Sequence, residues 1–149
     1  MLNQSHEDAI ELLKNDHSQV KAAFKEYETL ENKAYASKKK LADLICSDLV
    51  KHTIIEEEIF YPVVQNGSNE AQDLIDEALV EHASAKELIA QIQAMAPEDD
   101  LFDARVKVLS EQIEHYVKEE EKEMFPLAKK IKLNLVELGE RRAARKVQL

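Results

Sequence analysis

Hydrophobic residues recur at three- and four-residue steps along four long stretches of the chain, which is the spacing of one face of an α-helix. The pattern predicts helices over about residues 7–34, 38–64, 70–95 and 101–131, followed by a shorter helix over about 135–146. Turn-forming residues separate the stretches, including Asn66-Gly67-Ser68-Asn69 and Pro97-Glu98-Asp99-Asp100. Ser5 is expected to cap the first helix, and Gly67 to close the second in a left-handed conformation.

The short connections between these helices favour antiparallel neighbours. We therefore expect an all-α fold, an up-down-up-down antiparallel four-helix bundle with a short C-terminal fifth helix. The whole chain, 1–149, is expected to form one domain of two helical hairpins, about 7–66 and 70–132, plus the last helix. Its composition agrees, with only 2 Gly and 3 Pro against 44% hydrophobic and 34% charged residues.

The charge balance bears on the classes of partner. A net charge of −10 argues against a nucleic acid or an anionic membrane as partner. Cys46, the single cysteine, has no internal disulfide partner and is expected in the core, which favours a reducing compartment. No apolar run is long enough for a leader or a membrane span, so a cytoplasmic location is expected.

An internal repeat sets four histidines in equivalent positions of the two halves. His17 is matched by His82, 65 residues later, and the pair His52 and Glu56 is matched by a second pair, His115 and Glu119, 63 residues later. The remaining histidine, His6, lies outside the repeat and is expected to have no special role. Such a duplication is typical of one helical hairpin copied to close a bundle.

The repeated residues have the chemistry of a metal centre. Residues four apart on a helix project the same way, and His17 and His82 lie on apolar stripes, so all six side chains should point inward. Burying them without partners would be costly, whereas imidazole and carboxylate ligands suit iron, and two metals can share bridging carboxylates. The predicted ligands of this centre, with two iron ions per chain, are His17, His52, Glu56, His82, His115 and Glu119.

The pattern H…HxxxE…H…HxxxE, carried by these six residues, resembles the hemerythrin-like family, also called the HHE cation-binding domain. The resemblance implies a four-helix bundle around a non-haem di-iron centre bridged by two carboxylates. It also implies oxygen, nitric oxide or peroxide chemistry, or iron sensing. Oxygen-carrying members have a further His four residues from the one on the third helix, whereas this chain has Ala78 and Lys86 at that spacing from His82.

The two copies differ in the spacing to the following proline. Pro62 follows His52 by ten residues, whereas Pro126 follows His115 by eleven. Alignment on the prolines would pair Glu56 with Glu120, which a one-residue π-bulge could present. We expect Glu119 as the second bridging carboxylate and keep Glu120 as the alternative.

Several functions fit this centre. The leading hypothesis is a protein that binds or senses dioxygen, nitric oxide or peroxide, acting alone or with a protein partner. The alternatives are a peroxide- or NO-consuming enzyme, in which Tyr61 or Tyr116 could supply a proton or electron, an iron-handling protein, and a metal-free helical adapter. The basic tail is expected to balance the acidic bundle, to solvate the last helix or to dock on an acidic partner, and comprises Arg141, Arg142, Arg145 and Lys146.

Overall fold

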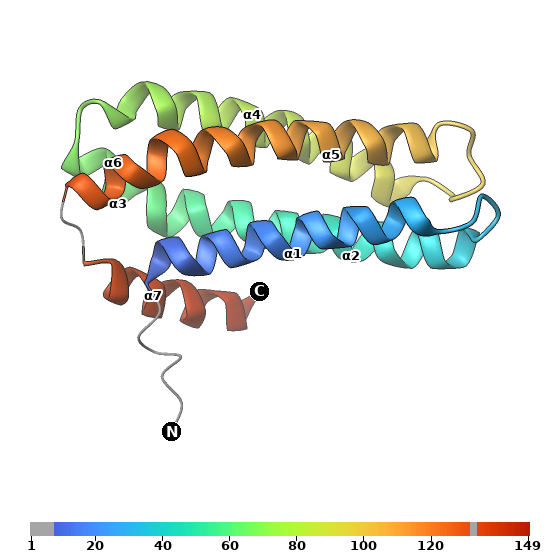
Figure 1. Cartoon of the computed structure of the whole chain (residues 1–149), viewed down its shortest axis with the longest axis horizontal. Helices are drawn as coiled ribbons and strands as arrows, with labels where there is room; N and C mark the ends of the chain where they lie inside the picture. The colour runs from blue at the N-terminus through green and yellow to red at the C-terminus, as the bar shows by residue number, and fades with distance from the viewer. Residues whose placement is uncertain (1–7, 132–133) are drawn as a thin grey trace.

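The computed structural model describes residues 8–131 and 134–149, and within these ranges the chain is helical with no strand (Figure 1). This confirms the all-α class. Ser5 and His6 lie outside the described residues. The elements in chain order are α1 (Ala9–Thr29), α2 (Tyr35–Ile55), η2 (Glu56–Phe60), α3 (Tyr61–Gly67), α4 (Ala71–Ala94), α5 (Phe102–Glu119), η3 (Glu120–Met124), α6 (Phe125–Lys130) and α7 (Leu135–Gln148).

The long helices lie lengthwise beside one another, with α4 and α5 over α1 and α2 (Figure 1). The segments η2 and η3 are π-helical turns that continue α2 into α3 and α5 into α6. The last helix, α7, packs along α1 (Figure 1). Within the described ranges, no helix has both the length and the apolar character needed to cross a membrane.

Two helix ends differ from the sequence-based expectation. The helix α1 begins at Ala9 because the Asp8 carboxylate accepts the Glu11 amide at 2.8 Å. Gly67 is the last residue of α3, and no left-handed conformation closes the helix there. The glycine has a packing role instead, since a Cβ atom at this position would lie 2.6 Å from Cδ1 of Ile131.

The described interior contains two large apolar clusters with a polar layer between them, and a small third cluster of Ala9, Ile59 and Leu138. One cluster surrounds Phe102 and Leu109 and includes Cys46, which is buried as expected. The other surrounds Phe60 and Phe125 near the opposite end of the long helices. These clusters hold the four long helices together by removing large apolar side chains from water, about 2–3 kcal/mol for each fully buried Phe. They therefore form a rigid frame on both sides of the polar layer.

Candidate metal centre

Two prolines shape the helices that carry the central carboxylates. Pro62 and Pro126 lack the N–H that a regular α-helix would use, and their rings crowd the carbonyl four residues earlier. Just before each proline the helix widens into a π-turn, in which the Tyr61 amide donates to the Glu56 carbonyl and the Phe125 amide to the Glu120 carbonyl. Each π-turn thus begins with a glutamate, and the two glutamates are 0% and 4% exposed.

Three imidazoles converge on these carboxylates through Nε2. His17 on α1 places Nε2 3.1 Å from Oε1 of Glu120 and 3.2 Å from Nε2 of His52. His52 on α2 and His82 on α4 place Nε2 3.2 Å and 3.4 Å from Oε1 of Glu56. Four long helices therefore contribute to one cluster in the interior of the bundle.

The other nitrogen of each of these rings faces a second carboxylate. Nδ1 lies 2.7 Å from Glu121 for His17, 3.0 Å from Asp16 for His52 and 2.7 Å from Glu57 for His82. A carboxylate at this position holds the Nδ1 proton and leaves the Nε2 lone pair free to bind. Imidazoles that ligate metals are commonly oriented in this way.

The carboxylate behind His52 is tied to the C-terminal helix. Arg142 on α7 donates a buried hydrogen bond to Oδ1 of Asp16, and Nζ of Lys146 lies 3.3 Å from the same oxygen. Arg145 on the same helix pairs with Glu58 at 2.9 Å. The basic tail therefore balances acidic groups of this chain, and Arg142 connects α7 to the orientation of His52.

Two tyrosines complete the cluster. Tyr61 donates its hydroxyl proton to Oε2 of Glu120 at 2.6 Å, and the same hydroxyl lies 3.4 Å from Nε2 of His82. Tyr116 donates to Oε1 of Glu56. Both phenols are buried, and burial together with the two carboxylates raises their pKa values well above the ordinary range.

The buried carboxylates of the cluster shift the pKa values of their neighbours and attract positive charge. Burial disfavours the imidazolium form of His52, but the charge of Glu56 and the hydrogen bond to Asp16 raise its pKa to about 10. Burial also opposes the ionised form of Glu56, yet the charge of His52 holds its pKa well below the ordinary value. Burial and the neighbouring Glu56 raise the pKa of Glu120 to about 7. Protons on imidazoles thus neutralise the buried carboxylates, and a bound cation can replace them.

The donor atoms fit a metal ion. Ligand atoms of His17, His52, Glu56 and Glu120 all lie within 4.8 Å of one another, and all four residues are buried. Within the described residues, Oε2 of Glu56 accepts no hydrogen bond, and Oε1 of Glu120 lies 3.1 Å from Nε2 of His17. An unpartnered buried carboxylate oxygen is costly, and a bound cation removes that cost.

The structure corrects two of the expected inward positions. His115 and Glu119 do not join the central cluster, because the His115 side chain is 67% exposed and that of Glu119 is 36% exposed. They lie at the surface with Glu81, where ligand atoms of the three residues are within 4.8 Å of one another. Burial and the charges of Glu119 and Glu77 raise the pKa of Glu81. The four other expected positions, His17, His52, Glu56 and His82, are buried in the cluster.

The correction follows from the register of the repeat. Aligning the two π-turns pairs Glu56 with Glu120, and the residue that then corresponds to His52 is Tyr116. His115 precedes Tyr116 by one residue, so it is turned by about 100° around α5 and faces outward. The offset between Pro62 and Pro126 was the available signal. The same alignment pairs Glu57 with Glu121, the carboxylates that hold His82 and His17.

Comparisons with known proteins agree with this geometry. A family model described as Hemerythrin HHE cation binding domain matches residues 8–128. A solved hemerythrin HHE cation-binding domain-containing protein from Mycobacterium kansasii is similar over 95% of this chain and 86% of that chain, with a TM-score of 0.80 and 25% identity.

A DNA nickase from Nostoc sp. (strain PCC 7120 / SAG 25.82 / UTEX 2576) is 35% identical over 83 residues, which is 54% of this chain and 22% of that protein. The chain therefore spans less than a quarter of the length of this curated relative. The family match covers most of the chain and includes every residue of the central cluster. The chain belongs to the hemerythrin HHE cation-binding domain family.

Proposed function

We propose that this protein is a non-haem di-iron protein that binds or senses a small oxidant such as dioxygen, nitric oxide or peroxide. The observation that carries the proposal is the convergence of three Nε2 atoms on two buried glutamates, each of which begins a π-turn. Imidazole and carboxylate ligands in a helix bundle suit iron, and carboxylates that lie between two ions can bridge them.

The ligand set is proposed to divide into two halves. His17 and His52 would hold one ion, and His82 with the tyrosine hydroxyls of Tyr61 and Tyr116 would face the other. Glu56 and Glu120 lie between the halves. Iron in such a centre supplies redox chemistry with small oxidants, while the residues of this chain bind it, orient it and limit the access of water.

Cavities beside the imidazoles give a small ligand access to the cluster. A cavity of about 160 Å³ reaches His52, His82 and Tyr116, and its other walls include Ile89 and Ile113. A wider cavity, of about 390 Å³, borders His17 and Glu121. A diatomic molecule or peroxide fits either cavity and arrives directly beside the imidazoles.

The tyrosines favour a second candidate function, in which the centre consumes peroxide or nitric oxide. Their hydroxyl protons are held on the oxygens of Glu120 and Glu56, within the cluster itself. A buried phenol in this position can deliver a proton or an electron to a bound molecule. Steady-state turnover with peroxide separates this candidate from a binding protein, since a rate no faster than that of free iron rejects it.

The proposed centre is tested by anaerobic iron loading, followed by desalting, metal analysis and a visible spectrum after exposure to air. We expect about two irons per chain and charge-transfer bands in the near-ultraviolet. Glu120→Gln should lower the retained iron, whereas Glu119→Gln should retain as much as the unchanged chain. Retention of zinc alone, or of no metal, would leave a structural or adapter bundle.

A further inference from the structure

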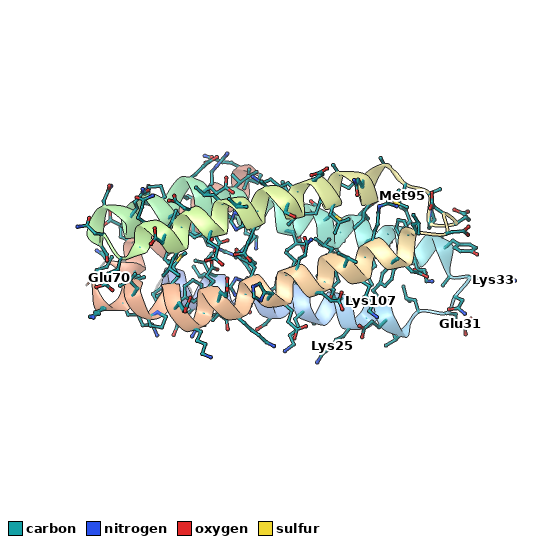
Figure 2. The ribbon with its side chains drawn as sticks, turned by 90° about the horizontal axis from the view of Figure 1, so that it is seen from above. Lys25, Glu31, Lys33, Glu70, Met95 and Lys107 are labelled. Carbon is teal, nitrogen blue, oxygen red and sulfur yellow. The ribbon has the colours of Figure 1, made fainter. Side chains whose placement is uncertain are left out.

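A second group of side chains with the chemistry of metal ligands lies outside the buried cluster, between α4 and α5, which run side by side (Figure 2). Glu81 comes from α4, and His115 and Glu119 come from α5. Their ligand atoms lie within 4.8 Å of one another, and Nε2 of His115 is 3.4 Å from Oε1 of Glu119. When several atoms bind one metal ion at about 2.1 Å, they lie closer to one another than 4.8 Å. The side chains of this group are partly exposed and can move closer together to reach that arrangement.

This surface group is continuous with the buried cluster. Glu81 and Glu119 border a cavity of about 20 Å³ whose inner wall includes Glu120 and Tyr116, and Glu77 borders it as well. A cavity of this size holds about one water molecule or one small cation. Glu120 is almost fully buried; its Oε1 lies 3.1 Å from Nε2 of His17, and its Oε2 accepts from the Tyr61 hydroxyl. The cavity therefore joins the partly exposed carboxylates of Glu81 and Glu119 to the buried carboxylate of Glu120, and Leu74, Ala78 and Met124 also line it.

We infer that Glu81, His115 and Glu119 form a peripheral divalent-cation site that receives the metal ion at the surface and passes it to Glu120. The binding site stands on the surface geometry alone, and its delivery role rests on the proposed function of the buried centre. One imidazole and two carboxylates match the borderline ligand preference of Fe²⁺, Mn²⁺ and Co²⁺. Exposure of the group allows a hydrated cation to exchange its water for these ligands in steps.

The negative charge around the surface site favours transfer of a cation from solvent towards Glu120. The site combines the carboxylates of Glu81 and Glu119 with that of Glu77 at the mouth of the cavity, in a chain with a net charge of −10. Acidic clefts concentrate cations and accelerate their association, by about tenfold or more at low ionic strength. At the inner end, the cation replaces the protons of the imidazoles and meets two buried carboxylates.

The experiment compares two double variants of the full chain. Glu81→Gln with Glu119→Gln removes two carboxylates of the peripheral site. Glu87→Gln with Glu111→Gln is the matched control, because it removes two exposed charges from the same two helices away from the cavity. Circular dichroism first verifies that both variants keep the helical content of the unchanged chain.

The first readout is Mn²⁺ binding followed by NMR, through paramagnetic broadening of the His115 ring signals. We expect broadening at submillimolar Mn²⁺ in the unchanged chain and the control, and about tenfold more Mn²⁺ for the same effect in the peripheral variant. Equal broadening in all three proteins, or none in the unchanged chain, overturns the peripheral site. All three proteins also carry Glu56→Gln and Glu120→Gln in this measurement, because Mn²⁺ bound in the buried centre would broaden the same ring signals.

The second readout is the rate at which Co²⁺ enters the metal-free chain, followed by visible absorbance in a stopped-flow instrument at low ionic strength. The peripheral variant should load about ten times more slowly than the control and reach the same final absorbance. Equal rates overturn the delivery role. Absence of Co²⁺ absorbance in every protein instead rejects the buried centre, while the His115 signals still decide the surface site.

Discussion

Asp16→Asn tests whether the carboxylate behind His52 controls metal binding. In the structure Oδ2 of Asp16 faces Nδ1 of His52 at 3.0 Å, and its other oxygen accepts from Arg142. Asparagine has nearly the same shape and lacks the charge. Loss of such an outer carboxylate lowers metal affinity by about 10- to 100-fold. That corresponds to about 1.4–2.7 kcal/mol of binding free energy.

The same substitution affects folding, because Arg142 is 7% exposed and loses its anionic partner. Breaking a buried ion pair by removing one charge costs about 3 kcal/mol or more. For a chain of this size, we expect the melting temperature of the metal-free protein to fall by about 6–12 °C. Adding Arg142→Met removes the stranded charge and should restore much of the stability without restoring metal affinity.

The assays are zinc competition against a chromophoric chelator and thermal unfolding of the metal-free chain. Asp48→Asn is the control, since Asp48 is exposed and borders the same shallow cavity as Asp16. A zinc affinity within twofold of the unchanged chain in Asp16→Asn would refute the reasoning and leave Asp16 with a structural role only.

Four further predictions follow from the site and the core. His52 is protonated in the metal-free chain, with a pKa of about 10, so metal binding must displace a proton. Zinc affinity should therefore rise by about tenfold per pH unit for each displaced proton between pH 6.5 and 9. A zinc affinity that does not change with pH, measured by competition with a chelator, would contradict this. Folding of the metal-free chain should respond to pH in the opposite direction. His52 contributes its full stabilisation below its ordinary pKa of about 6.5 and loses it as the pH rises towards 10. The urea midpoint of the metal-free chain should therefore fall over that range. Phe102→Ala should cost about 3–5 kcal/mol in urea unfolding, because Phe102 is 0% exposed in the apolar cluster away from the centre, and should leave metal content unchanged in the folded fraction. Pro62→Ala supplies the missing N–H and permits a regular α-helix after Glu56 in place of the π-turn. Zinc affinity should then fall, although the helix gains a hydrogen bond. An unchanged zinc affinity would show that the π-turn is irrelevant to binding.

The sequence was sufficient for the helical class and for the residues whose position depends on one regular helix. His17, His52, Glu56 and His82 lie inward because a 3.6-residue period places them with buried apolar neighbours. The same argument failed for His115, where a fixed HxxxE spacing hid the one-residue shift between the two copies.

Other contacts of the centre depend on how distant elements pack. Asp16 meets Arg142 only because α7 returns along α1, and no periodicity within either helix indicates that pairing. Tyr61 reaches Glu120 across the bundle, which requires both π-turns in register. The sequence contained a local signal for the π-turns, Pro62 and Pro126, and none for the α7 contact.

Crystallographic anomalous scattering at the iron edge, on protein loaded without oxygen, tests the central claim most directly. The account predicts two peaks inside the bundle, both next to Glu56 and Glu120, one on the side of His17 and His52 and the other on the side of His82. Peaks confined to the surface, or a single peak distant from the two glutamates, would contradict it.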